Sequence, residues 1–114
     1  MTPMEKERPE GFAYPDLFMR AATAGLLDLD PWWALDDATL AARSAGLSQR
    51  YPTRNLIPFS RRQDNDEVAC WDLDLGGVSV VEDYSPPGQE QISHFEEFSQ
   101  WLAAALNDFI EYEE

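Results

Sequence analysis

Residues 56–84 read LIPFSRRQDNDEVACWDLDLGGVSVVEDY and alternate short apolar runs with polar turns. Three runs rich in β-branched and aromatic residues, at 56–60, 67–72 and 78–84, are separated by a charged turn and by a Gly-Gly pair. In the second run, apolar residues occupy both alternating sets, so both faces of that strand are expected to be partly apolar. The pattern predicts an antiparallel meander, in which Pro58 occupies an edge, a bulge or a first position.

Helical patterns flank this meander on both sides. A Tyr-Pro-Asp start at residues 14–16 predicts a helix that ends at Gly25, and a second helix is expected over 36–46, with a glycine at its end. A long C-terminal helix is predicted from Ser93, because Ser93 and Glu96 form a capping box ahead of apolar residues at three- and four-residue spacing. The expected fold is therefore α+β, a mostly antiparallel sheet packed by N-terminal helices and a long C-terminal helix.

The length of 114 residues allows one domain. Residues 1–12 are polar, charged and proline-containing, which predicts a loose arm, and residues 13–114 are expected to form a single domain. An apolar content of 44% is too high for a disordered acidic tail, so a packed core is expected. No stretch has the length of a membrane span and the first residues lack a signal-peptide core, so a cytoplasmic location is expected.

Charge is distributed unevenly along the chain. The net charge is −14, yet residues 1–62 hold eight acidic and eight basic side chains, whereas residues 63–114 hold fourteen acidic ones and no Lys or Arg. Such a chain is not expected to bind nucleic acid or an anionic membrane directly, because both are polyanions. Two interpretations remain open: a protein adapted to an acidic or salt-rich proteome, or a surface for a basic protein partner.

Enzyme motifs are missing from the sequence, and no catalytic residue, cofactor or metal site is predicted. The single histidine, His94, lies at the start of a predicted helix, and the single cysteine, Cys70, is expected to be a small buried hydrophobe. The Asp-Asn-Asp-Glu run at 64–67 lacks the spacing of a calcium loop. Asp72 and Asp74 alternate onto one side of a strand, which an exposed sheet face explains better than a glycosidase pair does.

Four tryptophans raise the question of a ligand cleft. Core packing is the favoured interpretation, because Trp71 and Trp101 lie on elements predicted to face inward. Trp32 and Trp33 are adjacent and cannot both point inward easily. Trp33 is therefore a candidate exposed anchor for a partner.

Several short motifs occur in a characteristic order. They are Tyr14-Pro15, Pro31-Trp32, Leu56-Ile57-Pro58-Phe59-Ser60, Asp66, Val68-Ala69-Cys70-Trp71-Asp72, the valine-rich run 78–81 and Phe98-x-x-Trp101-Leu102. From residue 14 to about residue 106 this series resembles the SUKH superfamily, the group related to the fungal Smi/Knr regulator of cell-wall synthesis. The resemblance implies an α+β fold, and many bacterial members are immunity proteins that neutralise toxins of contact-dependent or polymorphic systems. It also implies fold-marking roles, with no catalytic function, for Pro58, Phe59, Asp66, Cys70 and Trp101.

The resemblance and the acidic half together predict a non-enzymatic immunity or binding protein that blocks a basic toxin domain, a nuclease being one class. Alternatives are a regulatory scaffold that docks on a cellular enzyme, and a small-molecule-binding domain or hydrolase. The oligomeric state stays open. The candidate partner contacts are Asp64, Asp66, Glu67, Asp72, Asp74, Glu82, Asp83, Asp108, Glu111 and Trp33.

Overall fold

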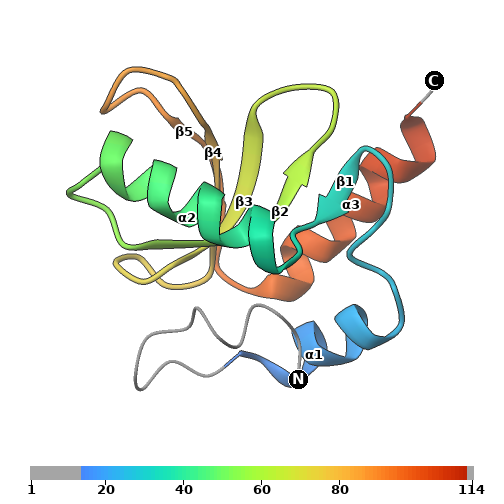
Figure 1. Ribbon diagram of the computed structural model, residues 1–114. Coiled ribbons are helices and arrows are strands. Elements are labelled where there is room, and N and C mark those ends of the chain that lie inside the picture. Colours follow the sequence, from blue (N-terminus) through green and yellow to red (C-terminus); the bar gives the residue numbers. More distant parts are fainter. Residues whose placement is uncertain (1–13, 113–114) are drawn as a thin grey trace.

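A computed structural model describes residues 14–112, which form three helices and one five-stranded sheet (Figure 1). All neighbouring strands are antiparallel, in the order β1-β2-β3-β4-β5, which confirms the predicted α+β class with a central meander. The arm predicted over residues 1–12 lies outside the described residues. In chain order the elements are α1 (Asp16–Thr23), β1 (Trp32–Ala34), α2 (Asp37–Arg50), β2 (Leu56–Arg62), β3 (Glu67–Asp72), β4 (Val78–Glu82), β5 (Gln91–Phe95) and α3 (Phe98–Glu111).

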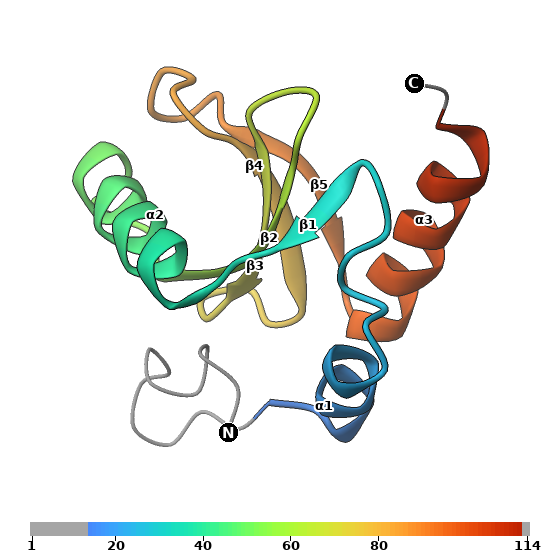
Figure 2. The ribbon, with the colours of Figure 1, turned by 45° about the vertical axis from the view of Figure 1, so that its right-hand side comes forward.

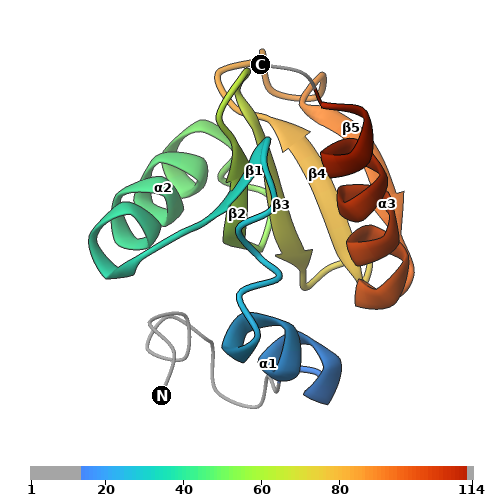
Figure 3. The ribbon, with the colours of Figure 1, turned by 90° about the vertical axis from the view of Figure 1, so that its right-hand side faces the viewer.

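The sheet is the middle layer of the fold, with α2 on one face and α3 and α1 on the other (Figures 2 and 3). Strand β3 shows why both faces need cover. Its Val68 and Cys70 pack with Leu47 of α2, whereas its Ala69 and Trp71 belong to the larger cluster on the side of α1 and α3. The partly apolar character predicted for both faces of this strand thus corresponds to two separate hydrophobic clusters.

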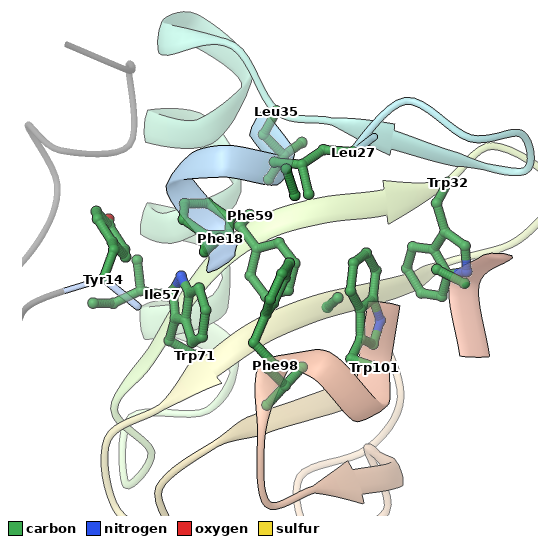
Figure 4. Packing of buried hydrophobic residues seen from close by; sticks show 14 of the residues in the cluster. Tyr14, Phe18, Leu27, Trp32, Leu35, Ile57, Phe59, Trp71, Phe98 and Trp101 are labelled. Carbon is green, nitrogen blue, oxygen red and sulfur yellow. The ribbon is translucent and has the colours of Figure 1, made fainter. Parts of the chain in front are cut away.

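Aromatic rings dominate the larger cluster (Figure 4). The ring of Phe59 on β2 lies at its centre, with centroids 4.9 Å from Trp71 and 4.9 Å from Trp101. Phe18 of α1 and Phe98 of α3 complete the group, with centroids 5.3 Å apart. Trp71 and Trp101 are buried as predicted, and these contacts tie both outer helices to the middle strands.

The predicted start of the C-terminal helix at Ser93 is wrong. Residues 91–95 form β5, in which His94 pairs with Ser79 and Phe95 with Val78 of β4. This pairing overrides the local helix-start pattern at 93–96, because the sheet supplies the backbone hydrogen bonds that a first helical turn would leave unmade. The helix begins at Phe98 instead.

Helix α2 begins as predicted but ends later. Asp36 caps it by accepting a hydrogen bond from the Thr39 amide at 2.9 Å, which is also the main reason the pKa of Asp36 is lowered. Gly46, predicted as the end of the helix, lies inside it. A Cβ at that position would collide with the guanidinium of Arg50, so the glycine permits this arginine to lie against its own helix.

No helix among the described residues is both long and apolar enough to span a bilayer.

Candidate acidic interaction surface

The β2–β3 turn, the end of β4 and the last turns of α3 lie at the same end of the molecule (Figures 1 and 3). Backbone and side-chain contacts join them: the Asp66 carbonyl accepts from the Asp83 amide at 2.9 Å, and the Gln63 amide donates to the Tyr112 hydroxyl. Arg62 bridges the turn to α3 through two carboxylates. We call this region the acidic end, and its members are Asp64, Asp66, Glu67, Glu82, Asp108 and Glu111.

Two glutamates of the acidic end lie directly opposite each other on neighbouring strands. Glu67 of β3 and Glu82 of β4 are directly paired in the antiparallel register. Like charges in such positions destabilise a sheet by roughly 0.2–1 kcal/mol. Among residues 14–112 neither carboxylate has a salt bridge. The fold therefore maintains a concentrated negative charge here that packing does not require.

Arg62 neutralises part of the acidic end. Its guanidinium binds both oxygens of Asp64 at 2.9 and 3.0 Å and lies 3.4 Å from Asp108 Oδ2. The hydrogen bond from Arg62 lowers the pKa of Asp64. Asp108 also accepts from the Trp32 indole at 3.0 Å. Within the described chain, the carboxylates of the acidic end without an ion-pair partner are Asp66, Glu67, Glu82 and Glu111.

Asp83 was predicted as a partner contact, but it is only 1% exposed. Its carboxylate accepts hydrogen bonds from Arg43 at 2.7 Å, from Arg50 at 2.6 and 2.8 Å, and from the Tyr84 amide at 3.0 Å. Burial alone raises the pKa of Asp83, but the two guanidinium groups outweigh it and the net pKa is lowered. The side chain fastens the end of β4 to α2 and is not available to a partner.

Asp72 is a second predicted partner contact that is buried in the structure. The sequence predicted an exposed sheet face, but this residue is only 2% exposed. It lies on the same side of β3 as Val68 and Cys70, where Arg54 of the loop between α2 and β2 binds it. It accepts from the Ser79 hydroxyl at 2.8 Å, from Arg54 at 3.1 Å, and from the Asp74 and Leu75 amides at 3.0 Å. These interactions overcome the effect of burial, which acts in the opposite direction, and the pKa of Asp72 is lowered.

The two remaining candidates lie elsewhere. Asp74 is exposed in the β3–β4 turn, at the end of β3 opposite the acidic end, and accepts from both nitrogens of Asn55. Trp33 is 42% exposed, its indole donates to Asp30 at 2.7 Å, and Arg61 lies 5.6 Å from the ring centroid. Trp32 is buried, so the adjacent indoles point apart as the sequence predicted.

The structure also assembles a group that the sequence did not reveal. Ser79 Oγ donates to Asp72, accepts from Gln91 at 3.2 Å, and lies 3.0 Å from His94 Nδ1. The Ser79 hydroxyl thus lies between the carboxylate and the imidazole, whereas a nucleophilic triad has the imidazole in the middle. Ser79 is also fully buried, so this group does not have the arrangement of a nucleophilic triad. The group holds β5 to β4. The group depends on residues 91–95 forming a strand, because pairing with β4 places His94 directly opposite Ser79.

Within residues 14–112, the cysteine and the metal-ligating side chains form no further reactive group. Cys70 is fully buried, and burial raises the pKa of its thiol. No cluster of three or more His, Cys, Asp or Glu residues arranged to hold a metal ion occurs within residues 14–112.

An open hollow of about 520 Å³ lies where α1 begins, at the β3–β4 turn and the start of α3. Its lining includes the apolar Leu17, Trp71, Leu73 and Phe98 and the acidic Glu97. It lies at the end of the sheet opposite the acidic end.

The chain matches no protein-family model, no curated protein and no solved structure. The resemblance to the SUKH superfamily therefore stays a prediction from the sequence motifs.

Proposed function

We propose that this chain is a non-enzymatic immunity protein that neutralises a basic toxin domain by covering its cationic surface with the acidic end. The observation that carries the proposal is a pair of glutamates whose negative charges are not neutralised. Four arginines bind carboxylates of the acidic half, yet Glu67 and Glu82 are left facing each other without a counter-charge among the described residues. The four are Arg43, Arg50, Arg54 and Arg62.

The acidic end is suited to binding without chemistry. Its carboxylates lie in a turn, on paired strand ends and on a helix, so little backbone ordering is needed when a partner arrives. A concentrated negative field steers a basic partner and raises the association rate at low ionic strength. The SUKH resemblance favours a toxin as that partner, and a cytoplasmic location belongs to the same proposal.

Charge reversal tests the proposal directly. The Glu67→Lys/Glu82→Lys double variant is compared with Asp74→Lys, which reverses an exposed carboxylate at the other end of the sheet. Products of the neighbouring genes are first tested for capture by the wild-type protein, and a captured basic toxin domain is then co-expressed with each variant while growth and association rate are measured. We expect the double variant to lose protection and to associate about tenfold more slowly at low salt, while Asp74→Lys protects normally. Capture of no basic partner, or full protection by the double variant, overturns the proposal.

Two alternatives have their own supporting features. Exposed Trp33 suits a regulatory scaffold that docks through an apolar anchor, and such binding depends little on salt. The 520 Å³ hollow beside Trp71 suits a small-molecule-binding domain. A ligand held there raises the melting temperature in a thermal-shift screen, and substitution of Leu73 by a charged residue removes that increase.

A further inference from the structure

A hollow of about 250 Å³ lies between α2 and the turn that follows β4. The last turns of α2 and this turn lie side by side (Figure 1). Arg43 and Arg50 line the hollow, and no Asp or Glu of the described chain does. In a protein with a net charge of −14, a hollow whose only charged lining is basic indicates an anionic ligand.

The two guanidinium groups are held side by side and keep free donors. Arg43 Nη1 and Arg50 Nη2 both bind Asp83 Oδ2, at 2.7 and 2.8 Å, and Arg50 Nε binds Oδ1 at 2.6 Å. Within residues 14–112 no acceptor binds Arg43 Nε, Arg43 Nη2 or Arg50 Nη1. Asp83 itself is buried and does not line the hollow. It therefore fixes both arginines from the buried side and leaves donors for a second oxyanion.

A glycine within α2 makes room for one of these groups. Gly46 lies inside a helix of 14 residues, where glycine is less favourable than alanine. A Cβ at this position would lie 2.5 Å from Arg50 Nη2. Gly46 also lines the hollow, so its missing side chain keeps the Arg50 guanidinium at the wall of the hollow.

Tyr84, which also lines the hollow, has a backbone conformation that tyrosine rarely adopts. It is the third residue of a turn closed by the hydrogen bond from the Ser85 amide to the Glu82 carbonyl, and its φ is +70°. Glycine is favoured at such a position. The tyrosine is nevertheless 65% exposed, with Arg50 Cζ 4.2 Å from its ring centroid. A costly conformation that keeps an exposed ring beside two arginines indicates a functional contact.

We propose that this hollow is a binding site for a small organic phosphate. The free nitrogens of Arg43 and Arg50 bind the phosphate oxygens, and the organic group lies against the ring of Tyr84. Three nitrogens are free, which suits the three terminal oxygens of a phosphate monoester better than the two of a carboxylate. The site goes beyond the proposed function and does not depend on it, because none of its residues belongs to the acidic end.

Phenyl phosphate tests the proposal on the full chain, with inorganic phosphate and phenol as comparison ligands at constant ionic strength. Calorimetry measures binding, and NMR chemical shifts of the arginine and tyrosine side chains locate it. The first variant is Arg43→Gln, which leaves Arg50 bound to both oxygens of Asp83. The second is Tyr84→Gly, which removes the ring and suits the positive φ. The matched control is Arg61→Gln, which removes the same charge from β2, outside the hollow.

We expect saturable binding of phenyl phosphate, roughly three- to tenfold tighter than that of inorganic phosphate because of the ring contact, and no binding of phenol. Arg43→Gln weakens phenyl phosphate binding about tenfold or more, because charged hydrogen bonds are lost, and Arg61→Gln leaves it unchanged. Tyr84→Gly binds phenyl phosphate and inorganic phosphate equally, and its melting temperature stays close to that of the wild type because the strain at positive φ is relieved.

Several outcomes overturn the proposal. They are the absence of saturable phenyl phosphate binding, shifts centred away from Arg50 and Tyr84, equal weakening by Arg61→Gln and Arg43→Gln, and an unchanged preference for phenyl phosphate in Tyr84→Gly. A chain with a net charge of −14 has no general affinity for anions, so saturable binding that Arg43→Gln alone weakens identifies this site. Loss of toxin protection by Glu67→Lys/Glu82→Lys bears only on the acidic end, so the two proposals fail separately.

Discussion

Replacement of Asp83 by Asn tests whether this buried carboxylate stabilises the fold, in contrast to the exposed carboxylates beside it. The side chain accepts three hydrogen bonds from Arg43 and Arg50 and one from the Tyr84 amide. Loss of one partner of a buried ion pair destabilises by about 3–5 kcal/mol. The arginine side chains are 22% and 29% exposed and can be rehydrated, and the asparagine oxygen still accepts from Tyr84, so we expect about 2–3 kcal/mol.

The neighbouring residue provides the control. Glu82→Gln removes the same charge one position earlier, but this side chain is exposed and faces Glu67, so its loss is expected to change stability by less than about 0.5 kcal/mol, towards stabilisation. Urea unfolding followed by tryptophan fluorescence at pH 7 measures both. A decrease of about 2–3 kcal/mol shifts the melting temperature of a domain of this size by roughly 10 °C. If Asp83→Asn stays within about 0.5 kcal/mol of the wild type, the ion-pair reasoning is refuted.

Three further outcomes are expected. Gly77→Ala destabilises by more than about 1 kcal/mol in urea unfolding, because Gly77 has φ +68° and a Cβ would meet the Phe95 carbonyl oxygen. The free energy of unfolding falls as pH drops below about 4, because the pKa values of Asp72 and Asp83 are lower in the folded than in the unfolded chain. The stabilisation from these two carboxylates is complete above their unfolded pKa and is lost when they are protonated. The Asp83→Asn variant lacks one of them, so its stability depends less steeply on pH in acid. The thiol of Cys70 reacts slowly with a disulfide reagent in the native protein and fully in urea, and equal rates would contradict its burial.

Local sequence patterns were sufficient for much of the fold. The three runs from 56 to 84 carry both the period of strands and the turns that join them, so the meander could be predicted without knowledge of distant contacts. Residues 91–95 could not be assigned this way, because a serine three residues before a glutamate is a genuine helix-start signal. Only pairing with β4 makes the segment a strand.

The candidate surface was predicted less completely, because exposure depends on what packs over a strand. Asp72 and Asp74 are two positions apart, so the two-residue period of a strand predicts that both side chains lie on the same side. In the structure the first is within β3 and buried, whereas the second lies in the following turn and is exposed. Burial of Asp83 follows from Arg43 and Arg50, which are more than thirty positions away, and no local pattern encodes that contact.

The division of charge along the chain is not a division in space. Arg43 and Arg50 of α2 reach the end of β4 to bind Asp83, and Arg54 binds Asp72, so basic residues of the neutral half neutralise carboxylates of the acidic half. The α2 side of the sheet is therefore internally balanced. The carboxylates of the acidic end that lack an ion-pair partner among the described residues lie where β3 begins and where β4 and α3 end. If the acidic end binds a basic partner as proposed, substitutions on the α2 side should alter stability before they alter binding.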